Sequence, residues 1–182
     1  LNKGVHFLFK KHRITHVEGH AKLTAAPDPA RGTPATVEVH DQPGRVARTL
    51  TADRVLLATG AQPCELPGTP FDGERVIPSR RAMTLPEQPD RLVIVGAGAI
   101  GMEFAYFYNA FGTEVTVVEM LDRVLPVEDP DVSKAVAKAF KRQGITCLTG
   151  HKTESVESTD AGVRVTVAPA KGGESQTLEA DK

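Results

Sequence analysis

Apolar residues follow two different spacings along this chain. Leu92–Val95 is apolar at every position, which is typical of a strand buried on both faces of a parallel sheet. Val37–His40 and Val163–Val167 instead alternate between apolar and polar residues, as strands of antiparallel ribbons do. Asp41–Gly44 directly follows the first alternating run and predicts a hairpin turn. The chain is therefore expected to combine parallel and antiparallel strands.

In the second half of the chain the pattern predicts strands that alternate with helices. A helix follows Leu92–Val95 and carries aromatic residues at helical spacing, which we expect to lie in the core: Phe104, Phe107, Tyr108 and Phe111. A strand at Glu114–Val118 comes next. A second helix begins at Asp129–Pro130, ends before Gly144 and leads into a strand at Ile145–Leu148. This order predicts a parallel sheet, with Leu92–Val95 as its central strand.

Two segments in the two halves of the chain are nearly alike. Ile14–Lys22 and Ile145–Thr153 share Ile, Thr, Gly and His in register. Each is followed by an alternating run and then by a matching segment, which is Leu50–Arg54 in the first case and Leu178–Lys182 in the second. An internal repeat of this length indicates two copies of one kind of domain.

The repeat predicts one nearly complete domain and part of another, both α/β. We expect residues 1–66 to be the later part of one domain, residues 67–90 to be a proline-rich linker, and residues 91–182 to be a second domain truncated at its C-terminus. Val55–Leu57 is expected to be a buried strand that ends in a turn, and residues 4–12 fit a helix or a strand about equally.

The bulk composition argues against several classes of partner. The formal net charge of −1 over 182 residues gives no electrostatic footprint for nucleic acid or an anionic membrane. The longest apolar runs are strand-sized, far below the roughly 18 residues that suggest a membrane span. Cys64 and Cys147 lack C-x-x-C spacing and nearby His pairs, so we expect ordinary thiols and no metal site. These features indicate a cytoplasmic protein, or a mitochondrial one if a targeting segment precedes Leu1.

A glycine pattern directly follows Leu92–Val95. In G-x-G-x-x-G, Gly96 allows a tight turn, Gly98 lets a pyrophosphate approach the backbone, and Gly101 lets helix and strand pack closely. The phosphates then lie at the helix N-terminus, where free N–H groups and the helix dipole attract anions. Glu119 ends the next strand, and its carboxylate is suited to accept from both ribose hydroxyls and to repel a 2′-phosphate. The combination predicts a site for NAD rather than NADP.

These residues resemble the pyridine nucleotide-disulphide oxidoreductases, and within them the branch that oxidises dihydrolipoamide. The resemblance rests on Gly96–Phe104, Val115–Pro126, Ala58–Gly60 and the loop at Pro67–Gly68, and it extends over nearly the whole chain. It implies a Rossmann-like FAD/NAD(P)-binding fold with antiparallel β-ribbon insertions, FAD and NAD as cofactors, and a homodimer at full length. The implied activity passes electrons from dihydrolipoamide, on the lipoyl domain of a 2-oxo-acid dehydrogenase or glycine-cleavage complex, through a Cys pair and FAD to NAD.

The resemblance also implies roles for single residues of the fingerprint. Consecutive residues would form the NAD phosphate loop: Gly96, Ala97, Gly98, Ala99, Ile100, Gly101, Met102 and Glu103. Ile100 and Glu103 would also shape the place where nicotinamide meets flavin, although the sequence alone equally fits Glu103 as an exposed residue favoured by the helix dipole. Glu119 would hold the adenosine ribose, and Thr153 would touch the adenine end of NAD.

Two further segments would contact FAD. The first matches a family segment that passes the adenine of the flavin nucleotide, and it consists of Gly19, His20 and Ala21. The second matches the loop near the pyrophosphate and ribitol of that nucleotide, and it consists of Thr59, Gly60 and Ala61. Taken alone, His20 fits a surface histidine at a strand end, and Ala58–Gly60 fits a strand that ends in a turn.

The chain also departs from the family pattern. It contains neither the first G-x-G-x-x-G, nor the redox Cys pair spaced C-x-x-x-x-C, nor the C-terminal His-Glu base, so we expect no catalytic residue here and no activity from the chain alone. Ala99 stands where some relatives with another disulphide substrate have a gating Tyr, which favours the lipoamide branch. The alternatives are another flavoprotein disulphide reductase or soluble transhydrogenase of the family, and a non-enzymatic NAD-sensing module.

Overall fold

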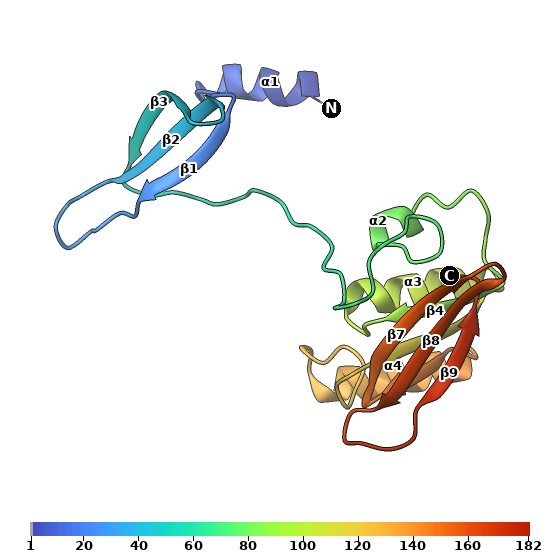
Figure 1. The fold of residues 1–182 in the computed structure, drawn as a ribbon. Coiled ribbons are helices and arrows are strands. Elements are labelled where there is room, and N and C mark those ends of the chain that lie inside the picture. Colours follow the sequence, from blue (N-terminus) through green and yellow to red (C-terminus); the bar gives the residue numbers. More distant parts are fainter. Residues whose placement is uncertain (1) are drawn as a thin grey trace. The chain divides into compact units, whose positions relative to one another are not determined.

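The computed structural model describes residues 2–182, which form two compact units divided between Ala61 and Gln62. In Figure 1 the first unit runs from blue to teal and the second from green to red. Each unit combines helix and sheet, and the second has the strand–helix alternation that the sequence predicts. The expected α/β class, with antiparallel sheets beside a parallel one, is confirmed.

The first unit consists of a helix and a three-stranded antiparallel sheet. Helix α1 spans Asn2–Lys11 and settles the ambiguity of residues 4–12 in favour of a helix. Strands β1 (His20–Ala25), β2 (Ala35–Gln42) and β3 (Arg45–Ala52) pair in the order β1-β2-β3. The predicted hairpin between β2 and β3 is confirmed, and its tight turn is possible because Gly44 adopts a φ of +78°.

The strand expected at Val55–Leu57 is not formed, so that prediction was wrong. These residues have no regular secondary structure, and the side chains of Leu56 and Leu57 are 90% and 70% exposed. An apolar segment becomes a strand only where a neighbouring strand accepts its hydrogen bonds. Within residues 2–182, no strand pairs with this segment.

The second unit is built around a three-stranded parallel sheet. Strands β4 (Arg91–Val95), β5 (Glu114–Glu119) and β6 (Thr146–Thr149) pair in the order β4-β5-β6. Helix α3 (Ala99–Ala110) connects the first two strands, and helix α4 (Pro130–Arg142) connects the last two. This is the predicted arrangement of successive βαβ units.

A second antiparallel sheet and a short helix complete this unit. Strands β7 (His151–Thr159), β8 (Gly162–Pro169) and β9 (Gln176–Ala180) pair in sequence order, as the alternating pattern predicts. Helix α2 (Ser79–Ala82) lies in the segment expected to be a linker, and the carbonyl of Ala82 accepts a hydrogen bond from the hydroxyl of Tyr108.

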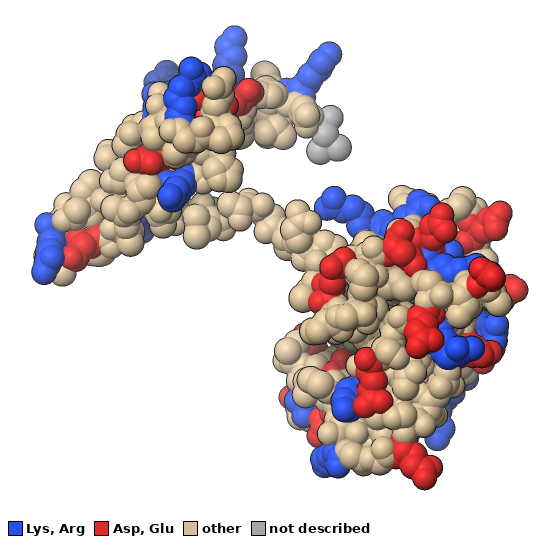
Figure 2. Space-filling view, viewed as in Figure 1, with Lys and Arg blue, Asp and Glu red and all other residues tan. Residues whose placement is uncertain are grey.

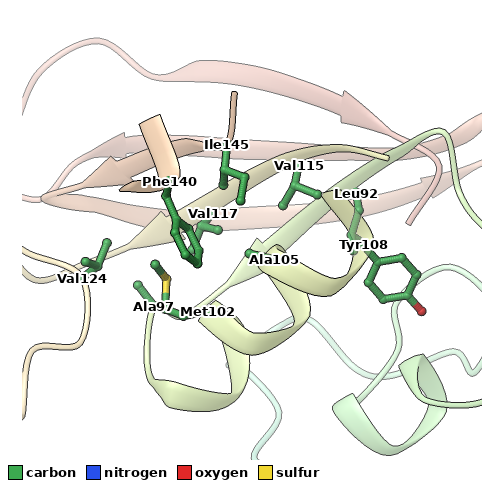
Figure 3. Packing of buried hydrophobic residues seen from close by; sticks show 10 residues of the cluster. All are labelled: Leu92, Ala97, Met102, Ala105, Tyr108, Val115, Val117, Val124, Phe140 and Ile145. Carbon is green, nitrogen blue, oxygen red and sulfur yellow. The ribbon is translucent and has the colours of Figure 1, made fainter. Parts of the chain in front are cut away.

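The parallel sheet is covered on both faces. Helices α3 and α4 pack on one face, over a core shown in Figure 3 that consists of Leu92, Ala97, Met102, Ala105, Tyr108, Val115, Val117, Val124, Phe140 and Ile145. Val118 points to the other face and packs with buried residues of the antiparallel sheet, among them Val163, Val165 and Val167. Successive residues of a strand point to opposite faces. Burial on both faces therefore explains the apolar sequences of β4 and β5.

The prediction that all four aromatic residues in and directly after α3 lie in the core was wrong in part. Tyr108 is buried and Phe104 packs partly against the core, whereas Phe107 and Phe111 are 51% and 66% exposed. Only one stripe of α3 faces the sheet, and it is formed by Met102, Ala105 and Tyr108 at a spacing of three. Phe107 and Phe111 lie off this stripe.

The order of the parallel strands also differs from the prediction, because β5 rather than β4 is central. Both helices lie on one face of the sheet, and right-handed crossovers on one face must step in the same direction. The outer edge of β4 is met by the end of the chain: Asp181 N–H donates to the carbonyl of Arg91 (3.0 Å), and Val93 N–H donates to the carbonyl of Lys182 (3.0 Å).

The segment before α2 is tied to the antiparallel sheet by the carboxylate of Asp72. Its Oδ1 accepts from three backbone N–H groups within residues 74–76 at 2.8–2.9 Å, and its Oδ2 accepts from the Ser158 hydroxyl at 2.7 Å. Burial alone raises the pKa of this carboxyl, but these hydrogen bonds outweigh it and lower the pKa from 3.8 to about 2. The ionised form is thus the one that the fold stabilises.

We expect this stabilisation to be lost in acid. A depressed folded pKa gives stability that is present above the unfolded pKa, near 4, and disappears as the pH falls through the folded value, about 2. Asp72→Asn keeps the Oδ1 acceptor but cannot ionise. Residue 72 of this variant should therefore contribute no change in the free energy of unfolding between these two pH values. Urea unfolding can be followed by fluorescence of Tyr106 and Tyr108, which both lie in the second unit. Equal losses in the two proteins between pH 4 and pH 2 would contradict the assignment.

Candidate dinucleotide-binding site

Two of the three fingerprint glycines are required by the backbone itself. Gly96 directly follows β4 with a φ of +104°, a conformation that other residues rarely adopt, and its N–H donates to the carbonyl of Val118 at 2.8 Å. A Cβ on Gly101 would lie 2.0 Å from the carbonyl oxygen of Gly96. The tight turn and the close approach of helix to strand, both predicted from the sequence, are thus present.

Gly98 has no such structural requirement. Its backbone angles, φ −72° and ψ 177°, suit any residue, and a Cβ built on it would meet no atom within 4 Å. It is exposed and caps the N-terminus of the 12-residue helix α3. No described residue accepts from the N–H groups of Gly98, Ala99 or Ile100. The turn therefore offers an open surface of unpaired donors at the positive end of a helix, which is suited to phosphate.

Glu119 points toward this turn, as predicted. It is the last residue of β5; its Oε2 accepts from the N–H of Ala97 at 2.8 Å and its Oε1 accepts from the N–H of Leu121 at 2.9 Å. A direct hydrogen bond joins Glu119 to the turn, and the contact of both with one bound adenosine stays a prediction. Each carboxylate oxygen has a further lone pair, so both can still accept from ribose hydroxyls.

The other predicted loop residues divide into buried and exposed positions. The side chains of Ala97 and Met102 belong to the core, whereas those of Ala99, Ile100 and Glu103 are exposed. Ile100 and Glu103 lie three residues apart on α3 and so share one face of the helix. No described side chain forms an ion pair with Glu103.

A largely apolar cavity of about 390 Å³ adjoins the turn on the β4 side, away from β5 and Glu119. Its lining includes Val95, Gly96, Ile100 and Phe104. The turn thus has a carboxylate on one side and an apolar hollow on the other. This hollow was not predicted, because most of the residues that line its far side lie within residues 67–90, which were expected to be a linker.

Thr153 lies on β7, directly across from Val167 of β8. Its Oγ1 is buried and has no hydrogen-bond partner among the described residues. Among the described residues, no hydrogen bond connects Thr153 to the fingerprint turn or to Glu119. Its contact with the adenine end of NAD stays a prediction.

The residues expected to touch FAD lie in the first unit and are not joined by hydrogen bonds in the described structure. Gly19 is explained by packing, since a Cβ there would come within 2.8 Å of the His40 carbonyl oxygen. His20 and Ala21 begin β1 and are exposed. Residues 59–61, which are Thr59, Gly60 and Ala61, lie in the exposed stretch after β3 that has no regular secondary structure. Their roles toward FAD stay predictions.

The remaining chemistry of the described residues is modest. Cys64 and Cys147 are free thiols, and burial raises the pKa of Cys147. Within residues 2–182 no three His, Cys, Asp or Glu side chains gather closely enough to hold a metal ion. In that range no helix has the length and apolar character needed to cross a membrane. Figure 2 shows acidic and basic side chains interspersed over the visible face of the second unit.

The order of strands and helices and the tight glycine turn define the architecture of the second unit as Rossmann-like. The sequence profile of the pyridine nucleotide-disulphide oxidoreductases matches residues 1–182, and the chain belongs to that family.

Its relatives include many dihydrolipoyl dehydrogenases. The chain is 42% identical over 179 residues to that of Mycobacterium leprae, covering 98% of this chain and 36% of the relative. It is 38% identical over 182 residues to the dihydrolipoamide dehydrogenase of Chaetomium thermophilum, of which it covers 34%. The chain thus spans about a third of the length of these relatives.

Solved structures with the same fold include two bacterial proteins. The crystal structure of LpdA from Mycobacterium tuberculosis matches with a TM-score of 0.69 at 35% identity, covering 91% of this chain and 34% of that one. A Cu(II) complex of a mutant of the HOCl-induced flavoprotein disulfide reductase RclA from Escherichia coli matches with a TM-score of 0.68 at 25% identity, covering 99% of this chain and 37% of that one. The predicted family resemblance is confirmed.

Proposed function

We propose that the chain is the NAD-binding domain and part of the FAD-binding domain of a dihydrolipoyl dehydrogenase. The relatives at 34–42% identity over nearly the whole chain support this assignment. NAD accepts a hydride in such chemistry. Within this chain, the N-terminus of α3 would hold the pyrophosphate and Glu119 would hold the adenosine ribose.

The observation that best supports this proposal is the glycine at position 98. The folded backbone explains why Gly96 and Gly101 are glycines, but it sets no demand at position 98, where neither the φ angle nor the space excludes a side chain. A glycine that the fold does not need is accounted for by a ligand that must approach the backbone closely. The residues present therefore fit a dinucleotide.

The proposal is tested by Gly98→Ala. The new methyl group would stand where the pyrophosphate approaches, so we expect the Kd for NADH, measured by isothermal titration calorimetry, to rise about tenfold. The free energy of unfolding should change by less than about 1 kcal/mol, because the backbone angles suit alanine.

Gly4→Ala is the matched control. Gly4 also has an ordinary φ and open space around its missing Cβ, but it lies in α1 of the first unit. It should leave the Kd unchanged. Unaltered NADH binding by Gly98→Ala, or no NADH binding by the unmodified chain, would refute the proposed role of the turn.

At the other side of the turn, Ile100 and Glu103 would border the nicotinamide, next to the flavin. The exposed position of both side chains and the apolar cavity beside Ile100 support this arrangement. The second half of the electron path, through FAD and a Cys pair to dihydrolipoamide on a lipoyl domain, belongs to the full-length homodimer, which we place in the cytoplasm.

A second candidate is a flavoprotein disulphide reductase with another substrate. The observation that favours it is the fold similarity to RclA, whose TM-score of 0.68 is nearly that of LpdA. Assays of the full-length enzyme with dihydrolipoamide and NAD distinguish the two, because only a dihydrolipoyl dehydrogenase should reduce NAD at the expense of that dithiol.

A further inference from the structure

Both backbone polar groups of Ala97 are held by residues from outside the turn. The N–H of Ala97 donates to Glu119, and its carbonyl accepts from the N–H of Leu125 at 2.8 Å. Ala97 has no exposed surface, so water cannot replace either partner. The segment between β5 and α4 therefore takes part in fixing the phosphate turn.

The direction of the Ala97 carbonyl determines the direction of the next donor. A peptide unit is planar and trans, so its N–H points opposite to its C=O. Because the carbonyl of Ala97 points at Leu125, the N–H of Gly98 must point away from it. This N–H is one of the unpaired donors on the open surface of the turn.

Leu125 adopts an unusual conformation to make this contact. Its φ is +47°, and in the described residues only Arg13 is another non-glycine residue with a positive φ. Side chains disfavour this region, and β-branched residues disfavour it most. The conformation is held by hydrogen bonds to the carbonyl of Leu125 from the hydroxyl of Ser133 (3.2 Å) and the N–H of Glu128 (3.0 Å).

Ser133 is a buried polar residue with few alternatives. It lies in the first turn of α4, is 2% exposed, and its hydroxyl is within hydrogen-bond distance of the carbonyls of Leu125 and Asp129. Each of these two carbonyls also accepts from one backbone N–H, and the hydroxyl lies slightly nearer to that of Leu125, at 3.2 Å against 3.3 Å. The hydroxyl can therefore restrain Leu125.

We propose that Leu125 and Ser133 are positioning residues for the dinucleotide: the Ser133 hydroxyl holds Leu125 in its left-handed conformation, and the Leu125 N–H aims the Gly98 donor at the pyrophosphate. The inference rests on the proposed function of the turn. Neither residue belongs to the G-x-G-x-x-G pattern.

Ser133→Ala is compared with Thr113→Val, which also removes a buried hydroxyl bonded to a backbone carbonyl, that of Pro89 at 2.8 Å. Thr113 directly precedes the start of β5, at the opposite end of the strand from Glu119. Both variants should lower the melting temperature by a similar few degrees. Only Ser133→Ala should weaken NADH binding, by about threefold to tenfold, and speed hydrogen exchange of the Leu125 amide.

Leu125→Ile provides an independent test, with Leu85→Ile as its control. Both leucines pack partly against the same core cluster, but only Leu125 has a positive φ. The β-branch should displace the backbone at position 125 and weaken NADH binding about threefold to tenfold. Leu85→Ile should bind NADH as the unmodified chain does.

Equal NADH affinity and equal Leu125 amide exchange in Ser133→Ala and Thr113→Val would overturn the inference. Failure of the proposed function has a different signature, namely no NADH binding by the unmodified chain. In that case amide exchange still decides whether Ser133 restrains Leu125, and the positioning role toward a dinucleotide is rejected.

Discussion

Gly101→Ala should destabilise the second unit by about 3 kcal/mol, at the upper end of the usual range for overpacking a well-filled site. The added Cβ would lie 2.0 Å from the carbonyl oxygen of Gly96 and 3.4 Å from Cγ2 of Ile94. The first contact is with backbone, which cannot rotate away as the end of a side chain can. Relief therefore requires α3 to move off β4, which would uncover the core around Met102 and Ala105.

The measurement is urea unfolding followed by tyrosine fluorescence, with Gly98→Ala as the control. The two glycines lie three residues apart in the same turn, but a Cβ at position 98 meets nothing within 4 Å. We expect a large loss of stability for Gly101→Ala and almost none for the control. Similar urea midpoints for Gly101→Ala and Gly98→Ala would contradict the close packing of α3 against β4.

Glu119→Arg should lower the affinity for NAD by about one to two orders of magnitude and shift the preference toward NADP. A charge-assisted hydrogen bond is worth about 1.5–3 kcal/mol, and 1.4 kcal/mol corresponds to about tenfold in affinity. The substitution removes the acceptor for ribose hydroxyls and also the acceptor for the Ala97 N–H. The guanidinium would attract the 2′-phosphate of NADP that the carboxylate repels.

Glu114→Arg makes the same change of charge at the opposite end of β5, where the side chain is exposed. Both variants are titrated with NADH and with NADPH in calorimetry. The control should keep the preference for NADH, so that a general effect of charge is separated from a local one. An unchanged NAD dissociation constant in Glu119→Arg would exclude the ribose role.

The fingerprint could be predicted because its glycines describe local backbone geometry. Position 96 requires a positive φ and position 101 has no room for a Cβ, and the spacing of the glycines indicates both requirements. The direction of Glu119 followed from its place at the end of a strand parallel to β4. Local sequence was enough for the two glycines because neighbours along the chain create their geometry, and the order of strands and helices was enough for Glu119.

Features that depend on distant partners could not be predicted in this way. Leu125 adopts a positive φ because of hydrogen bonds to Ala97, Glu128 and Ser133, and nothing about a leucine signals it. Val55–Leu57 has the composition of a buried strand but lacks a neighbour to pair with in the described structure. Periodicity likewise reveals that β4 and β5 are strands without revealing which is central.

The two hydrogen bonds that hold Glu119 also bear on the thermodynamics of binding. A flexible side chain that becomes fixed against a ligand loses rotational freedom, at a cost of about 0.5–1.5 kcal/mol. With one N–H on each carboxylate oxygen, Glu119 is already restricted to one rotamer in the folded chain. The entropy of ordering this side chain is thus lost during folding, and a ribose that meets it later binds to a rigid acceptor.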